Sequence, residues 1–348
     1  TYGTLRLDNG EKETMPDIFQ NYPGTLIGVS TLDELLIDNY AMGFASSSLS
    51  LNATNSITVT NYGVLRVRAG TTTIATTTLS DNGYLWIEPN GEFVTDSFSW
   101  DTGGTVIEEG IFTGRPSTFT VPTSTVYMPN RRGLTFDSLT VDGTVSHLQN
   151  IEQDAEDPVH RIDVTVTGDL VINPGGSVDV EAKGRWYNWS DDGTDRAGSS
   201  HGGYGGGDSG SGYDEPYGST TAPISIGKRG RTTPGAGGFR YGGTGGGAAK
   251  FTVLGTTTVD GYISADGEYS LTSNAVTNGS AGSVWLITEH LEGSGEIRAN
   301  GAAGNWFGAG GSSGGRIAIY ASTTDESGLT IEALGGQGDS DRLGAAGT

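Results

Sequence analysis

Hydrophobic and polar residues alternate in short stretches along much of the chain, which is the pattern of half-buried β-strands. Clear examples are Ile57-Thr58-Val59-Thr60 and Leu139-Thr140-Val141-Asp142. Asn-Gly pairs, which favour tight turns, follow or interrupt such stretches at Asn9-Gly10, Asn82-Gly83 and Asn90-Gly91. The pattern predicts an all-β chain of short strands.

Two strand-like stretches recur together towards the end of the sequence, the first every 33 residues and the second every 34. Each copy reads as strand, turn, strand and glycine-rich return, which is typical of a repeat unit that stacks on its neighbours. We therefore expect a right-handed parallel β-helix, or β-solenoid, whose handedness follows the general rule for parallel connections. The first stretches begin at Lys250, Ser283 and Arg316, and the second at Ile263, Ile297 and Ile331.

An earlier copy of the repeat, at 162–184, is followed by a long glycine-rich insertion over about 185–249. A solvated linker would need few aromatic residues, yet this insertion contains eight. We expect it to pack on the repeats.

The N-terminal part has a shorter period. Strand-like stretches at 64–67, 84–87 and 105–108 lie 20 and 21 residues apart. This spacing fits a solenoid with layers of about 20 residues, and it also fits an antiparallel β-sandwich. The sequence thus predicts two parts, 1–150 (solenoid or sandwich-like) and 151–348 (a glycine-rich solenoid).

Composition narrows the function classes. The chain has 59 glycines in 348 residues, which disfavours helix. Its 41 acidic and 19 basic residues give a net charge of −22, which argues against a nucleic-acid partner. The absence of cysteine excludes disulfides, thiol nucleophiles and cysteine-bound metals, and no apolar run approaches the length of a membrane-spanning helix.

Several short motifs resemble those of very large glycine-rich bacterial surface and extracellular proteins. They include 2–9, 134–141, the glycine-rich tract, Gly314-Gly315-Arg316-Ile317-Ala318-Ile319-Tyr320 and Gly344-Ala345-Ala346-Gly347-Thr348. The resemblance implies a secreted or cell-surface, adhesin-like β-solenoid, and it supplies no catalytic residues.

The two ends of such a solenoid are candidates for assembly. A fourth copy of the repeat would begin at position 349, so the last layer is expected to present an open strand edge to a neighbour. We therefore expect a structural module of an extracellular or cell-surface fibre or adhesin that associates head to tail, as a homopolymer or as tandem modules. The residues assigned to the contact are Thr1, Tyr2, Leu5, Ala346, Gly347 and Thr348.

The alternative is a carbohydrate-binding or polysaccharide-cleaving β-helix, including a phage-type tailspike, since such folds use paired carboxylates. Trp186, Tyr187 and Trp189 are candidates for stacking on sugar rings, which makes surface glycans a candidate partner. Catalytic residues are not assigned.

Calcium is the one cofactor considered, because oxygen ligands on glycine-rich turns suit its irregular coordination. The candidate ligands are Asp191, Asp192, Asp195, Asp339 and Asp341.

Overall fold

A computed structural model describes most of the chain. The described residues are 2–8, 25–27, 31–45, 51–151, 154–185, 197–207, 215–230, 233–235, 238–240, 242–269, 278–304, 310–325, 328–338 and 342–348. They contain strands, turns and extended segments but no helix, as the alternating pattern predicted, so none of them forms a helix able to cross a membrane. The chain divides into two compact units, Thr1–Val145 and Ser146–Thr348.

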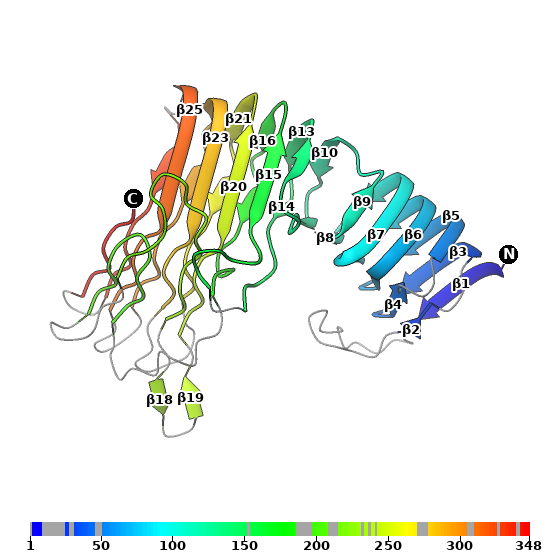
Figure 1. Cartoon of the computed structure of the whole chain (residues 1–348), viewed down its shortest axis with the longest axis horizontal. Helices are drawn as coiled ribbons and strands as arrows, with labels where there is room; N and C mark the ends of the chain where they lie inside the picture. Colours follow the sequence, from blue (N-terminus) through cyan, green and yellow to red (C-terminus); the bar gives the residue numbers. More distant parts are fainter. Residues whose placement is uncertain are drawn as a thin grey trace. The chain divides into compact units, whose positions relative to one another are not determined.

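The first unit consists of parallel strands joined by tight turns (Figure 1). Its strands are β1 (Tyr2–Asp8), β2 (Thr25–Leu26), β3 (Thr31–Asp38), β4 (Met42–Ala45), β5 (Leu51–Val59), β6 (Val64–Leu79), β7 (Tyr84–Trp100), β8 (Thr105–Glu108), β9 (Ile111–Thr113), β10 (Thr118–Val121), β11 (Val126–Met128), β12 (Leu134–Phe136), β13 (Ser138–Val141) and β14 (Thr144–Val145).

Parallel pairing within this unit runs in the order β1-β3-β5-β6-β7-β8-β11-β14. Val64 lies opposite Tyr84, and Tyr84 lies opposite Thr105, so the predicted spacing of 20 and 21 residues is confirmed. The pairs β2–β4, β4–β6, β7–β9 and β10–β13 are also parallel. An antiparallel sandwich is therefore wrong for the described strands of this unit.

Three turns of the first unit, at 38–41, 60–63 and 80–83, have four residues with positive φ at both central ones. In one of them, Asn61 and Tyr62 have φ of 49° and 62°, and Gly63 N–H donates to Thr60 O at 2.8 Å. This is a type I′ turn, which suits Asn and Gly. Asn82-Gly83 belongs to an equivalent turn, as predicted, whereas Asn90-Gly91 lies inside β7 at a register irregularity and forms no hairpin turn.

The second unit is built from longer parallel layers and one small antiparallel hairpin. Its strands are β15 (Ile162–Val166), β16 (Leu170–Ile172), β17 (Ser177–Asp179), β18 (Thr233–Gly235), β19 (Gly238–Arg240), β20 (Ala248–Val253), β21 (Thr256–Val259), β22 (Tyr262–Ser264), β23 (Ser283–Glu292), β24 (Glu296–Arg298), β25 (Arg316–Asp325) and β26 (Thr330–Glu332). Parallel pairing runs through β15-β20-β23-β25, β16-β21-β23 and β17-β22-β24-β26, and β18–β19 is antiparallel.

The registers of this unit confirm most of the predicted alignment. Ser283 lies opposite Arg316, 33 residues further on. The residue opposite Ser283 on the other side is Ala248, however, and Lys250 lies opposite Trp285. The predicted alignment of Lys250 with Ser283 was therefore wrong by two residues. A shift of two keeps the same side chains facing inward, so the alternating pattern does not detect it.

The glycine-rich returns are extended segments that lie side by side beyond the strands of this unit (Figure 1). We call 264–269, 278–283, 298–304, 310–316, 332–338 and 342–348 the extended segments. Backbone hydrogen bonds of 2.8–3.0 Å join 310–317 to 342–348. They recur at every third residue, which is the period of the polyproline II conformation. The donors and acceptors are Gly311 to Arg342, Gly314 to Ala345, and Ile317 to Thr348.

The residues between these donors bond to other neighbours. Ser312 N–H donates to Ala302 O at 3.0 Å, and Ser313 N–H donates to Ser199 O at 2.9 Å. Successive N–H groups therefore point to three different segments around one axis, so an extended segment is held on three sides without sheet geometry.

Glycine is required in these segments because neighbouring backbones lie too close for a Cβ atom. A Cβ built on Gly282 would overlap Gly247 O, and one on Gly336 would overlap Ala302 O. Neither glycine has positive φ, so steric exclusion, as in collagen, sets the residue type.

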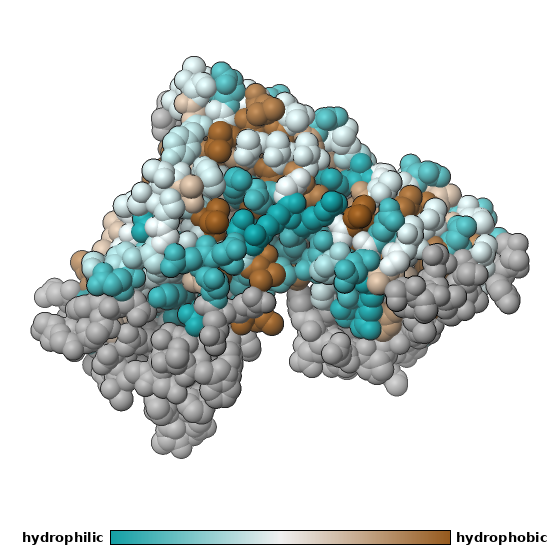
Figure 2. All heavy atoms as spheres, in the orientation of Figure 1, coloured by the Kyte–Doolittle hydropathy of each residue, from teal (hydrophilic) through white to brown (hydrophobic). Residues whose placement is uncertain are grey.

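The described part of the insertion packs on the repeats, as expected. His201 N–H donates to Ser313 Oγ at 2.7 Å, and Ser199 Oγ donates to Asn278 O at 2.7 Å. On the face drawn in Figure 2, hydrophilic and near-neutral residues cover most of the described surface, and hydrophobic residues form small separate groups.

Candidate functional site

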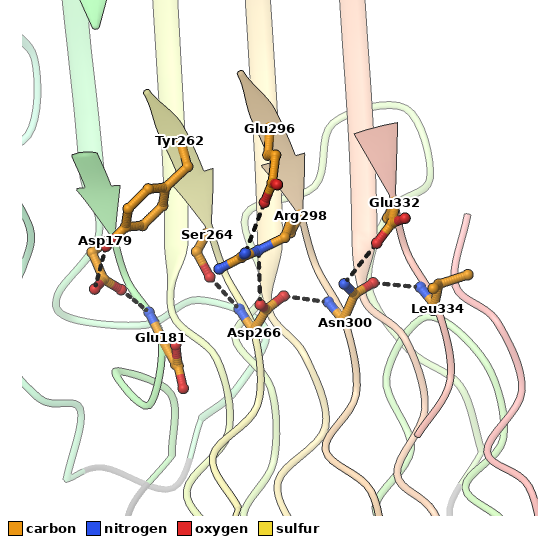
Figure 3. Close-up of polar contacts among 10 residues, drawn as sticks. All are labelled: Asp179, Glu181, Tyr262, Ser264, Asp266, Glu296, Arg298, Asn300, Glu332 and Leu334. Atoms are coloured by element: carbon orange, nitrogen blue, oxygen red, sulfur yellow. Dashed lines mark hydrogen bonds and ion pairs between the residues drawn. The ribbon is translucent and has the colours of Figure 1, made fainter. Parts of the chain in front are cut away.

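Side chains at three equivalent positions form a row where β22, β24 and β26 end, and the first two of them are polar (Figure 3). Asp266, Asn300 and Leu334 occupy equivalent positions, 34 residues apart. Asp266 Oδ1 accepts the N–H of Asn300 at 2.6 Å, and Asn300 Oδ1 accepts the N–H of Leu334 at 2.7 Å. The side chains of Asp266 and Asn300 thus each bond the backbone of the next layer, and we call the positions 266, 300 and 334 the Asx ladder.

Arg298 is the cation beside this ladder. Its guanidinium lies 3.2 Å from Asp266 Oδ2, and its Nη1 donates to Glu296 Oε2 at 2.8 Å. Burial lowers the pKa of Arg298, but the carboxylates of Asp266 and Glu296 outweigh burial and hold it above its usual value. Burial raises the pKa of Asp266, opposed by the hydrogen bond from Asn300 and by Arg298.

Two more carboxylates continue the row in the earlier layer. Asp179 Oδ1 accepts the N–H of Glu181 at 3.0 Å, and Asp179 Oδ2 lies 3.5 Å from the hydroxyl of Tyr262 (Figure 3). Burial, Asp179 and Asp266 all raise the pKa of Glu181. Most of the acids in this row bond to backbone N–H groups or to Arg298. Two of these contacts, Asp266 with Asn300 N–H and Asp266 with Arg298, join neighbouring layers.

A metal site is not formed by the described residues, among which no group of three or more His, Asp or Glu is placed to hold an ion. The hydrogen bonds from Asn300 N–H to Asp266 and from Leu334 N–H to Asn300 support the packing of layers, as those of buried polar groups generally do.

The last layer of the second unit, which we call the terminal layer, comprises β25, β26 and the extended segments 332–338 and 342–348. Val178, Ile263, Ile297 and Ile331 are opposite one another in successive strands. The first three are 0% exposed, whereas Ile331 is 39% exposed. Ile331 is thus a core position whose covering layer is not among the described residues.

Other apolar residues of the terminal layer show the same difference. Ile319 lies opposite Leu286 and is partly exposed, although Leu286 is fully buried. Leu334 and Leu343 are 53% and 61% exposed.

Among the described residues, backbone N–H groups of the terminal layer also lack the hydrogen-bond partners that their equivalents have in earlier layers. In the preceding layer, Ala299 and Gly301 donate to the carbonyl oxygens of Glu332 and Leu334, both at 2.8 Å. Two earlier pairs of donors bond the next layer in the same way, Val180 with Ala182 and Ala265 with Gly267.

The equivalent donors of the terminal layer are the N–H groups of Ala333 and Gly335. Within the described part of the chain they have no hydrogen-bond partner. Together with the exposed core positions, they make the terminal layer an unsatisfied edge, the type of surface that pairs with another strand.

A second strand edge lies in the first unit. Among the described residues β1 pairs only with β3, with Leu5 opposite Leu35 and Leu7 opposite Ile37. Leu5 and Leu7 are partly exposed, whereas their partners are buried.

The structure places the predicted assembly residues at these two edges. Leu5 lies in β1, as does the backbone of Tyr2. Ala346, Gly347 and Thr348 lie in the terminal layer, where Gly347 N–H donates to Ala333 O at 2.7 Å. Thr1, the sugar-binding candidates and the calcium candidates lie outside the described residues and stay predictions: Trp186, Tyr187, Trp189, Asp191, Asp192, Asp195, Asp339 and Asp341.

Two histidines are buried where the extended segments meet their neighbours. His147 Nδ1 lies 2.7 Å from Leu148 O, and its Nε2 accepts the N–H of Ala248 at 3.2 Å, so the ring is neutral. His201 Nδ1 lies 2.7 Å from Ala281 O, and its ring lies 4.7 Å from that of Tyr217. Burial lowers the pKa of His147 to about 3 and that of His201 to about 4.

Sequence reasoning did not identify the Asx ladder or the open donors. The signal was present, because Ala265-Asp266-Gly267, Ala299-Asn300-Gly301 and Ala333-Leu334-Gly335 keep the frame Ala-x-Gly and change only the central residue. Comparison with family models, with curated protein sequences and with solved structures found no match to this chain.

Proposed function

We propose that this protein is a structural module of an extracellular or cell-surface fibre or adhesin, and that it assembles through the open edges of a right-handed parallel β-solenoid. The observation that carries the proposal is the terminal layer, where Ile331 is 39% exposed at a position that is fully buried in three preceding strands. Such an edge gains apolar burial and backbone hydrogen bonds when a further layer is added.

The fold that we propose for the repeats is a solenoid. Its support is the parallel register of β17, β22, β24 and β26, in which each strand lies opposite the next copy of the repeat. The glycine-rich composition and the resemblance to bacterial surface proteins agree with this reading.

Charge favours association at the edges over association at the sides. A net charge of −22 keeps copies apart laterally, whereas the exposed residues Ile331, Leu334 and Leu343 of the terminal layer are apolar. Asp266 bonds the backbone of the next layer and Arg298, and Glu296 bonds Arg298, which favours a structural role over polysaccharide cleavage.

Sedimentation velocity over a wide range of protein concentration, with electron microscopy of the same samples, tests the proposal. We expect assemblies that grow with concentration and are lost in the variant Ile331→Lys. The matched control is Leu254→Lys, since Leu254 is 62% exposed but lies after β20, away from the terminal layer. A monomer at every concentration, or assembly unaffected by Ile331→Lys, would overturn the proposal.

A further inference from the structure

Side chains with hydroxyl groups form two rows on one face of the first unit. Five strands of this unit carry Ser or Thr at two positions separated by one residue, at intervals of 20 or 21 residues along the chain. The residue between the two is buried or partly buried, and both hydroxyl residues are partly or fully exposed, so each pair points outward. The following ten residues are called the hydroxyl face: Ser56, Thr58, Thr76, Thr78, Ser97, Ser99, Thr118, Thr120, Ser138 and Thr140.

The strand registers align the two rows from layer to layer. In β5, β6 and β7, Thr76 lies opposite Ser56 and Ser97, and the second row is aligned in the same way. Both rows are also aligned between β10 and β13. The strand β10 lies beside the end of β7, since Trp100 Nε1 donates to Thr120 O at 3.3 Å. The rows therefore run across five layers.

The hydroxyl face carries no charge, although the chain has 41 acidic residues and a net charge of −22. Six of its ten residues are threonine, which places a methyl group beside the hydroxyl. None of the ten is aromatic, whereas a surface for sugar rings would offer the apolar faces of aromatic side chains. Uncharged donors, acceptors and methyl groups in a regular array complement an uncharged ligand that is itself a regular network of hydrogen bonds.

The spacing of the rows indicates which network this is. Neighbouring strands lie about 4.8 Å apart, and successive outward residues of one strand lie about 6.7 Å apart. In ice each water bonds four others tetrahedrally at about 2.75 Å, so two waters that share a neighbour lie about 4.5 Å apart. The same geometry repeats about every 7.3 Å along the hexagonal axis of ice. Both spacings agree with those of the hydroxyl face to within about a tenth.

We infer that the hydroxyl face binds ice, with its hydroxyl and methyl groups matched to the water lattice of the crystal surface. The strands hold these groups in place before binding, so little conformational entropy is lost when the surfaces meet. This function goes beyond the proposed structural role and does not depend on the strand edges that carry that role.

Partition into a slowly growing ice crystal tests the inference, with serum albumin in the same solution as a reference. We expect the natural protein to be enriched in the ice relative to albumin. Thr76→Lys places a long charged side chain in the hydroxyl face and should remove the enrichment. The matched control is Thr73→Lys, which should keep it, because Thr73 is an exposed threonine of the same strand that lies outside the hydroxyl face.

The variant Thr118→Lys repeats the test in β10, and it replaces Thr76→Lys if that variant fails to fold, since Thr118 is also exposed. A natural protein no more enriched in ice than albumin, or an equal loss of enrichment in Thr73→Lys, would overturn the inference.

Binding to an insoluble polysaccharide is the competing outcome. Co-sedimentation with cellulose or chitin that Thr76→Lys abolishes, without enrichment in ice, would overturn the inference and assign the hydroxyl face to a polysaccharide surface. Neither result bears on the proposed function, because sedimentation velocity measures assembly separately and should give the same result for Thr76→Lys and the natural protein.

Discussion

The two units stack parallel strands in the same manner but return the chain in different ways. In the first unit the chain turns sharply, and residues such as Asn61 and Tyr62 adopt positive φ to allow it. In the second unit the chain runs out and back in extended segments with ordinary φ, and the absence of a Cβ allows the segments to pack. Close backbone therefore excludes a Cβ in both units, at Gly63 and Gly83 in the first as at Gly282 in the second. What differs is the return of the chain, because only the tight turns place residues such as Asn61 and Tyr62 at positive φ.

The largest effect that tests this comparison is expected from the extended segments. In Gly282→Ala the new Cβ overlaps Gly247 O and adjacent backbone, so we expect the second unit to lose about 3 kcal/mol or more of unfolding free energy. The control is Gly175→Ala, where φ is 88° and no atom lies within 4 Å of the added Cβ. That variant should lose only about 1 kcal/mol, from backbone strain. Urea denaturation measures both, and equal losses would contradict the distinction.

The second-largest effect is expected from acidification, which should lower the unfolding free energy of the second unit. His147 and His201 are neutral when folded, with pKa values of about 3 and about 4, against about 6.5 in an unfolded chain. The unfolded state therefore binds more protons below pH 6.5. Stability is fully present above pH 6.5 and falls as the pH drops towards 4, by about 3 kcal/mol for each histidine.

Unfolding measured between pH 4.5 and 7.5 checks this dependence. Lys228 and Arg316 near His201, and His160 and Lys183 near His147, act in the same direction because they disfavour a second positive charge. The variant His201→Gln should reduce the slope of stability against pH. An unaltered slope in His201→Gln would contradict the assignment.

A proline pair compares an inner layer with the terminal layer. Ala299 N–H donates to Glu332 O at 2.8 Å, whereas Ala333, its equivalent one layer later, has no partner among the described residues. Ala299→Pro should therefore cost about 2 kcal/mol, through a lost hydrogen bond and a ring placed against the carbonyl. Ala333→Pro should cost less than about 0.5 kcal/mol in the monomer. Thermal melting at low concentration measures both, and similar shifts would contradict an open edge.

The smallest expected effect concerns the Asx ladder. Asn300→Ala removes the acceptor for Leu334 N–H and should cost about 1 kcal/mol. Asn300→Asp keeps that acceptor but places a charge beside Glu332, which Asn300 Nδ2 contacts at 3.3 Å. Its stability should therefore recover at a pH low enough to protonate the pair, whereas that of Asn300→Ala should not.

The strand positions were the part of the fold that the sequence could predict. Inward side chains such as Leu286 and Ile297 recur at a fixed spacing, because each must reach the same interior. The register of β20 against β23 could not be predicted to better than two residues, since a shift of two leaves inward and outward faces unchanged.

The arrangement of the glycine-rich returns could not be predicted from the sequence in the same way. Backbone groups form the bonds between Gly311 and Arg342 or between Gly314 and Ala345, and these groups are identical in every residue. A tract of glycines therefore indicates close packing without indicating which segments are neighbours. The Asx ladder could have been predicted from the sequence, because Asp266, Asn300 and Leu334 are the only variable positions in a repeated tripeptide frame.

The threefold rotation of N–H groups along the extended segments limits how such a chain can change in length. Adding one residue within 310–316 would turn every later donor by a third of a revolution, away from its acceptor and towards the wrong neighbour. Adding three would restore the direction of every donor, provided that β25 keeps its register on β23. We therefore expect insertions and deletions in these segments to be tolerated best in multiples of three residues, a spacing that the tight turns of the first unit do not impose.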